Sequence, residues 1–502
     1  MTLSRITQNI FWNWSGRILE AVVGFFVMPY LIIRLGDTSY GLWGVISAMS
    51  GYFGILDLGT CGSIGRYVAL YRAKNDQPQV NATFSTALVL MLFLGAVGLS
   101  GMTLSQLVFF RIFEVPPEQM SDARWALFLL GLNLALMFVF SAFDAMLWAY
   151  QRFDLLNLTN GTSALTRAAL TFTLIDYGSS VVRLGIITLG ATAVVGILKV
   201  ILVFRTDREL RVGWSHCRRA VLPELFGYGI WRFLMVIGRM GTTRLNIFVV
   251  GHWLTLGAVT PFNLAVRLMA YTVDVLDAVR ETLTPVATTQ HAQNRENWQP
   301  TFLIEGGKLG FTVGLFFFTL FVFLGAPLIE IWVKPQYAFA STLLVILTAG
   351  ELIPMSQTAS TSMILGTGKH RVLALLHLLE LVLVLGLSIA VATPYGLKGL
   401  CIAQAVSATL CRGVLQCAYA LRQAKLSVWD YLARAILPPA TLAVAPVAAL
   451  AVLVSWHRPT NRYELVAYGA LYGIVYLLAA LPLLGFGRVW SRVRAMVRSE
   501  AA

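Results

Sequence analysis

The chain has 502 residues, of which 57% are hydrophobic and only 12% are charged. Soluble domains carry about 25% charged residues, so this composition excludes an ordinary water-soluble enzyme and indicates a membrane protein. The formal net charge of +14 does not imply a nucleic-acid partner, because basic loops on the cytoplasmic side of a membrane account for most of it.

Apolar stretches long enough to cross a bilayer follow one another along almost the whole chain. A spanning helix needs about 20 mostly apolar residues to match a hydrocarbon layer about 30 Å thick. The sequence therefore predicts an all-α, polytopic membrane protein with about fourteen transmembrane helices. These helices are expected near residues 8–33, 40–64, 83–110, 123–147, 157–177, 180–204, 224–251, 257–285, 301–330, 338–365, 372–393, 396–421, 432–455 and 463–484.

The lysine and arginine residues in the gaps predict the orientation, since cytoplasmic loops carry an excess of both. Of the 38 basic residues, 22 fall on one predicted side, Arg412 among them, and eight fall on the other. This bias predicts that both termini lie in the cytoplasm.

A weak internal repeat divides the chain. A shift of 217 residues places Asp57 of the second span on Asp274 of the eighth. This pairing predicts two six-helix lobes in parallel repeat, an arrangement that in transporters usually puts the substrate site between the lobes. The predicted divisions are an N-terminal lobe (1–205), a basic cytoplasmic linker (206–222), a C-terminal lobe (223–424), and two extra transmembrane helices with a basic tail (425–502).

Charged residues inside the predicted spans are the main candidates for a site. Each basic residue facing lipid at mid-membrane would cost about 2.5–3.5 kcal/mol even on the mildest scale, so all of them must face acids, carbonyls or a wet cavity. The basic set is Arg17, Arg167, Lys199, Arg232, Arg239, Arg244, Arg267 and Lys308. The acidic set is Glu20, Asp57, Asp144, Asp274, Asp277, Glu351 and Glu380. Because the two sets nearly balance, one interpretation is that about half of these charges pair to fix the helices in register.

The other interpretation is functional. Arg232 and Arg239 point within about 20° of each other on a helix, and guanidinium groups suit phosphate because their donors form a planar fork. The candidate substrate-binding residues are therefore Arg17, Arg232, Arg239 and Arg267. The acids offer an alternative role, in which carboxylates in a dry cavity carry protons or cations. The candidates for ion coupling are Asp57, Asp274 and Asp277.

Motifs of soluble enzymes are missing from the sequence. Gly366–Lys369 suggests a phosphate loop, but Met363 occupies the position of its required first glycine, and the six histidines have no metal-ligand spacing. We therefore expect a transporter, with no catalytic residues, metal site or cofactor. The short outward loops argue against a membrane glycosyltransferase, polymerase or ligase, which is the third alternative.

The stretch Tyr40–Ala69 (YGLWGVISAMSGYFGILDLGTCGSIGRYVA) resembles the motif of bacterial polysaccharide flippases. It has the YGLW start, the central LDLG, and an arginine, Arg66, seven residues after that glycine. Trp148–Asn157 (WAYQRFDLLN) resembles the family's turn after the fourth span. The family belongs to the superfamily that also holds multidrug/cation antiporters and lipid II flippases.

This resemblance implies a V-shaped central cavity and alternating access. The cargo it implies is an undecaprenyl-diphosphate-linked oligosaccharide, such as an O-antigen or exopolysaccharide repeat unit, moved from the inner to the outer leaflet of the bacterial cytoplasmic membrane. Arg17 is similar to an arginine of the lipid II branch, and the two extra helices look like those that form a groove for the lipid tail there. The implied partners are the lipid-linked oligosaccharide, membrane lipids and a polysaccharide polymerase or other export machinery, with no nucleic acid. An ion-coupled multidrug/cation antiporter of the same superfamily is the alternative.

Overall fold

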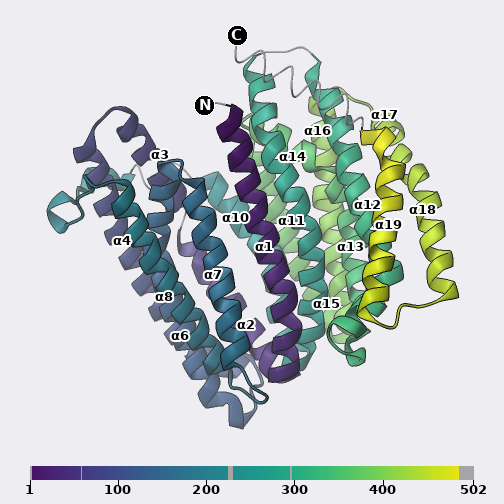
Figure 1. Ribbon diagram of the computed structural model, residues 1–502, viewed down its shortest axis with the longest axis horizontal. Coiled ribbons are helices and arrows are strands. Elements are labelled where there is room, and N and C mark those ends of the chain that lie inside the picture. The colour runs from purple at the N-terminus through teal and green to yellow at the C-terminus, as the bar shows by residue number, and fades with distance from the viewer. Residues whose placement is uncertain (1–2, 58, 224–229, 294–296, 485–502) are drawn as a thin grey trace. The chain divides into compact units, whose positions relative to one another are not determined.

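The computed structural model describes residues 3–57, 59–223, 230–293 and 297–484, and all regular elements in these ranges are helical (Figure 1). The all-α prediction is confirmed. The chain divides into two compact units. One consists of Met1–Met240 with Val250–Thr260, and the other of Gly241–Val249 with Pro261–Ala502.

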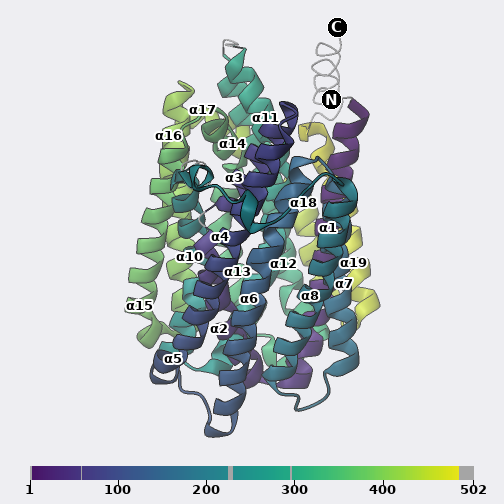
Figure 2. The same cartoon turned by 90° about the vertical axis from the view of Figure 1, so that its left-hand side faces the viewer.

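The first unit is built from long helices and short turns. Its helices are α1 (Leu3–Leu35), α2 (Asp37–Phe53), α3 (Thr60–Ala73), α4 (Gln77–Leu104), α5 (Gln106–Ile112), α6 (Met120–Ala149), α7 (Phe153–Leu174) and α8 (Val181–Thr206). Helix α6 packs between α4 and α8, and α1 packs along α7 (Figures 1 and 2). Side-chain caps set two of the starts, since Asp76 accepts a hydrogen bond from the amide of Gln79 and Ser180 accepts one from the amide of Val182.

Helix α10 (Ile230–Trp253) contributes residues to both units, and so does the next helix, whose residues up to Thr260 belong to the first unit. The other helices of the second unit are α11 (Leu256–Ala292), α12 (Trp298–Trp332), α13 (Ala340–Ser356), α14 (Thr358–Gly366), α15 (His370–Ala408), α16 (Gln416–Gln423), α17 (Val428–Tyr431), α18 (Leu437–Trp456) and α19 (Arg462–Leu484), with π-helical segments at Thr409–Leu415 and Leu432–Ile436. Helix α12 packs against α13, and α18 and α19 pack against each other and against α12 (Figure 1). A side chain at Gly310 would collide with the carbonyl of Met355, so this glycine permits the close approach of α12 and α13.

Nine helical stretches in the described residues are long and apolar enough to cross a membrane, or ten if the bent pair α13 and α14 counts as one span. The protein is therefore a multi-pass membrane protein. The predicted number of fourteen is not confirmed, because α7, α10 and α11 are not among these stretches. One of the nine, His370–Gln423, has 54 residues, which is more than a single crossing needs, and it is kinked at Gly396, where φ is 56°.

The turns of the first unit alternate between two ends. At one end, Gln77 donates a hydrogen bond of 2.9 Å to Asp207, and the hydroxyl of Tyr150 also donates to Asp207. At the other end, the amide of Gly178 donates to the carbonyl of Arg34 at 2.9 Å. The predicted alternation therefore holds in this unit, while the assignment of the first end to the cytoplasm stays a prediction.

The basic segment predicted as a linker, 206–222, is folded onto the first unit. The amide of Arg211 donates to the side chain of Asn81 at 3.1 Å, and that of Arg218 donates to Thr86 at 3.0 Å. Burial raises the pKa of Asp207, but hydrogen bonds from Tyr150, Gln77 and two backbone amides outweigh burial and hold this pKa below its usual value. The segment is thus tied to the end of the helices by both backbone and carboxylate contacts.

Candidate functional site

Asp57 lies at a break in the second predicted span. Helix α2 ends at Phe53, a 3-10 turn runs from Gly54 to Asp57, and α3 begins at Thr60. Gly59 has a φ of 76°, in the left-handed region that favours glycine. The Asp57 carboxylate accepts a hydrogen bond from the Thr60 hydroxyl at 3.0 Å and one from the amide of Cys61 at 3.2 Å. The LDLG motif therefore builds a helix break, and Asp57 satisfies donors in the first turn of α3.

This geometry predicts that Asp57→Asn retains transport, because an amide oxygen can still accept both hydrogen bonds. Asp57→Ala leaves these donors without their acceptor and should destabilise the protein by about 1 kcal/mol. Both variants can be compared by thermal unfolding and by a transport assay. Loss of transport in the folded Asp57→Asn variant would instead support the coupling role predicted from the sequence, because the amide removes only the charge.

The YGLW motif has a packing role in the structure. Leu42 is fully buried, and Tyr40 and Trp43 pack against the core cluster that includes Leu31. A side chain at Gly41 would collide with the carbonyl of Leu256. The residues that carry the resemblance thus specify close helix packing and a helix break.

The second stretch with that resemblance forms the turn between α6 and α7. Helix α6 ends at Ala149 and α7 begins at Phe153. Gln151 adopts a positive φ of 57°, and Arg152 pairs with Asp154 at 2.9 Å. The predicted turn after the fourth span is therefore present.

Helices α10 and α11 carry exposed charged side chains far from their ends. Arg239 lies nine residues into α10, and Arg267 and Asp274 lie 11 and 18 residues into α11. Arg267 and Asp274 share a face because they are seven residues apart, and the Arg267 guanidinium lies 4.9 Å from the centre of the Tyr271 ring. Since charges at this depth are too costly to leave in hydrocarbon, these side chains must contact water, a polar ligand or polar groups of the protein.

Asp277 lies on α11, three residues after Asp274. Its side chain is largely buried, and it pairs with Arg280 at 2.9 Å, one helical turn further on. The sequence interpretation of Asp277 as an ion-coupling group thus has a local alternative, an ion pair within one helix.

Two of the four predicted substrate-binding arginines, Arg17 and Arg232, have side chains outside the described part of the structure. Their backbones belong to α1 and α10. Their roles stay predictions.

Two of the other basic residues inside the predicted spans pair with acids, as expected if such charges fix the helices in register. Lys199 of α8 contacts Asp144 of α6 at 2.8 Å, and these side chains are 13% and 29% exposed. Lys308 pairs with Glu305 on the same helix at 3.0 Å. The first pair ties α8 to α6 and fixes their register, whereas the second lies within one helix.

Arg412, counted from the sequence among the basic residues of the cytoplasmic side, lies among the helices and pairs with buried acids. Arg412 lies in the π-helical segment after α15, where its guanidinium binds Glu380 of α15 at 2.9 Å and Glu351 of α13 at 2.8 Å. The two glutamate side chains are only 2% and 6% exposed. Its position within the predicted span 396–421 was the available signal.

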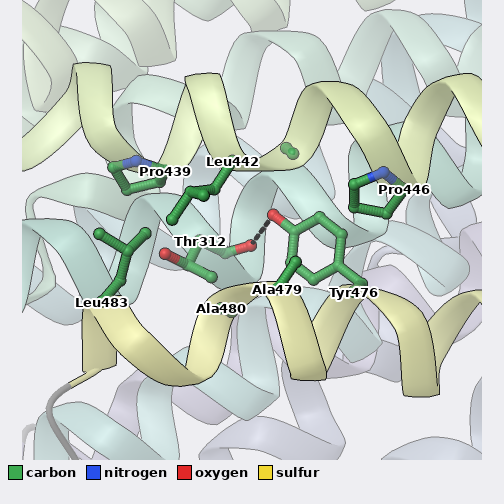
Figure 3. Close-up of a pocket in the computed structure, with 9 residues that line it drawn as sticks. Thr312, Pro439, Leu442, Pro446, Tyr476, Ala479, Ala480 and Leu483 are labelled. Carbon is green, nitrogen blue, oxygen red and sulfur yellow. Dashed lines mark hydrogen bonds between the residues drawn. The ribbon is translucent and has the colours of Figure 1, made fainter.

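A small, mostly apolar pocket with a cavity volume of about 10 Å³ lies between α12, α18 and α19 (Figure 3). Pro439, Pro446 and Ala480 contribute to its lining. At its side, the Tyr476 hydroxyl donates a hydrogen bond of 2.9 Å to the Thr312 carbonyl. The pocket is smaller than the roughly 300–1,000 Å³ of most ligand sites, and its lining suits hydrocarbon rather than a sugar.

Long apolar helices with exposed charges at mid-length define the class as polytopic membrane proteins. The chain belongs to the polysaccharide biosynthesis protein family, whose profile matches residues 6–289. This match confirms the resemblance found in the first spans.

Individual relatives are similar to this chain at low identity. A Shigella flexneri protein named "Putative O-antigen transporter" is 22% identical over 420 residues, which cover 82% of this chain and 97% of that protein. The structure of the lipid II flippase MurJ in an inward closed conformation aligns with a TM-score of 0.73 and 14% identity, covering 96% of this chain and 99% of that one. An inward-facing MATE family multidrug resistance transporter aligns with a TM-score of 0.67 and 16% identity, covering 81% and 98%. The fold is therefore that of these transporters.

Proposed function

We propose that this protein is a flippase that moves an undecaprenyl-diphosphate-linked oligosaccharide from the inner to the outer leaflet of the bacterial cytoplasmic membrane by alternating access. The cargo is an O-antigen or exopolysaccharide repeat unit. Both termini face the cytoplasm in this proposal, residues 1–205 and 223–424 act as two six-helix lobes, and the protein works as a transporter rather than an enzyme. Family membership and similarity to the Shigella flexneri protein support the cargo class.

The observation that carries the proposal is the exposure of Arg239, Arg267 and Asp274 far from the ends of α10 and α11. A diphosphate-linked glycan has an anionic head that cannot cross hydrocarbon unaided and a tail that stays in lipid. In this proposal the exposed arginines supply charge-assisted donors to the diphosphate, and the exposed carboxylate of α11 accepts hydrogen bonds from sugar hydroxyls. The proposed binding set therefore keeps Arg17, Arg232, Arg239 and Arg267.

The mostly apolar surface formed with α18 and α19 lies beside the tail in this proposal. Its proline, alanine and leucine side chains offer no partner to a charged group. A prenyl chain needs only an apolar surface beside the helices, which agrees with the groove implied for the two extra helices.

Deletion of the gene in the parent bacterium tests the function. The expected result is an accumulation of undecaprenyl-linked repeat units on the inner leaflet and a loss of surface polysaccharide, both restored by the wild-type gene. Unchanged surface polysaccharide together with increased drug sensitivity would favour an ion-coupled multidrug/cation antiporter. A glycan bond made by the purified protein from a lipid-linked donor would favour a glycosyltransferase, polymerase or ligase.

A further inference from the structure

The basic segment 206–222 of the first unit presents positive charge on its surface. Its arginine side chains are all exposed, at Arg208, Arg211, Arg218 and Arg219. Of its two acids, Asp207 accepts hydrogen bonds from Gln77 and Tyr150 at the end of the helices, and Glu209 is exposed. Four exposed guanidinium groups thus share this segment with one exposed carboxylate.

Hydrogen bonds from backbone amides hold the segment along the first turns of α4 (Figure 2). The amides of Arg211 and Arg218 donate to side chains of α4, as described above, and the amide of Gly213 between them donates to the Ser85 hydroxyl at 3.4 Å. Ser85 is the ninth residue of α4, so the segment reaches about 12 Å along this helix from its start. Because the donors are backbone amides, the arginine side chains are not needed to hold the segment in place.

The composition of α4 changes at the level that the segment reaches. Polar residues recur in residues 77–86, whereas residues 87–94 are entirely apolar. Helix α4 has 28 residues and is about 42 Å long, which exceeds the hydrocarbon layer of about 30 Å by about 12 Å. The polar first turns account for this excess, so the hydrocarbon boundary falls close to Ser85 and Thr86.

Trp214 follows Gly213 and therefore lies near this boundary. Its side chain is 78% exposed, and that of Val212 is 38% exposed. Tryptophan is enriched at the level of the lipid headgroups, because its ring is amphipathic. The planar guanidinium fork of arginine binds phosphate oxygens with charge-assisted hydrogen bonds. The segment thus combines an interfacial aromatic ring with phosphate-binding groups.

We propose that the segment 206–222 is a docking surface for anionic phospholipids of the adjoining leaflet. Trp214 enters the headgroup region, and Arg211, Arg218 and Arg219 bind the lipid phosphates. The level of the segment on α4 favours lipid over a soluble anionic partner, because headgroups are the anions that lie at the hydrocarbon boundary. The surface belongs to the first unit and does not depend on the cargo, so this inference goes beyond the proposed function.

The test is 19F NMR of the full chain, labelled with 5-fluorotryptophan, in phosphatidylcholine nanodiscs. The Trp214 signal is assigned by its absence in Trp214→Phe. The nanodiscs contain the same small fraction of either phosphatidylglycerol or phosphatidylcholine with a spin label high on the acyl chain, so the two probes differ only in the headgroup. Spin-labelled phosphatidylglycerol should broaden the Trp214 signal about twofold more, or beyond, because the arginines concentrate anionic lipid beside the ring.

Replacing three arginines together, Arg211→Gln, Arg218→Gln and Arg219→Gln, should abolish this excess broadening. The backbone amides that hold the segment remain in this variant, and thermal unfolding checks that the fold is intact. The comparison of the two lipids in the wild type decides the proposal by itself even if this variant does not fold.

The matched control removes three exposed arginines from the other end of the helices of the first unit, with Arg111→Gln, Arg124→Gln and Arg183→Gln. This variant should keep the excess broadening of the Trp214 signal. Equal broadening by the two lipids in the wild type, or no broadening by either, overturns the docking surface. An excess that persists in the folded variant of the segment overturns the role of its arginines.

Discussion

Replacing Arg412 with methionine should lower the free energy of unfolding by about 3–5 kcal/mol, because two buried carboxylates then lose their shared cation. Glu351 and Glu380 come from different helices, so the guanidinium also ties α13 to α15. Unfolding of the purified protein in detergent measures the loss. The free energy of unfolding of Arg412→Lys should lie between those of the wild type and Arg412→Met. An ammonium group keeps the charge but loses the planar fork that binds both carboxylates.

The matched control removes the charges together. A triple variant with Arg412→Met, Glu351→Leu and Glu380→Leu leaves no charge of the ion triad unpaired and should recover most of the lost stability, because apolar side chains of similar volume can replace a buried ion pair. A triple variant as unstable as Arg412→Met alone would show that shape, rather than uncompensated charge, causes the loss.

The sequence predicted the helical class correctly because the signal for each span is local. A run of about 20 apolar residues predicts a transmembrane helix by itself, whatever that helix packs against. The break at LDLG was not predicted, because its leucines continue the apolar run of the second span. Only the backbone, with Gly59 at positive φ and Asp57 bonded to the first turn of α3, reveals it.

Charge partners were harder to predict because they are distant in sequence. Lys199 and Asp144 are 55 residues apart, and Arg412 and Glu351 are 61 apart. A balanced count of charges predicted that some would pair, but it could not say which. The local pair Lys308 and Glu305, one helical turn apart, is the kind that spacing alone reveals.

The role of the charged faces of α10 and α11 stays a prediction. The sequence predicted that Arg239 and Arg267 could not face lipid, and both side chains are exposed in the structure. Their assignment to the substrate remains a prediction, and so does that of Arg17 and Arg232. Among the acids, Asp57 and Asp277 have structural partners that explain their burial without a coupling role.

Replacing Arg239 or Arg267 with alanine should slow glycan flipping by about 10- to 100-fold, because each loses a charge-assisted hydrogen bond to the diphosphate worth about 1.5–3 kcal/mol. Lysine at either position should restore part of the rate, since it keeps the charge without the fork. The measurement is the fraction of a lipid-linked oligosaccharide in proteoliposomes that becomes accessible to an added glycosidase over time.

Arg124 provides the matched control, because it is an exposed arginine in the first turns of α6, where the end of a helix meets water. Arg124→Ala should flip glycan at the wild-type rate. Full activity in both Arg239→Ala and Arg267→Ala would show that the diphosphate does not bind to these two arginines. A loss confined to drug efflux, with glycan flipping intact, would assign them to an antiporter. An arginine at mid-membrane raises the free energy of the folded protein, so its presence calls for a function. If Arg239→Ala and Arg267→Ala lost neither stability nor transport, these two arginines would have no function that explains this free-energy cost.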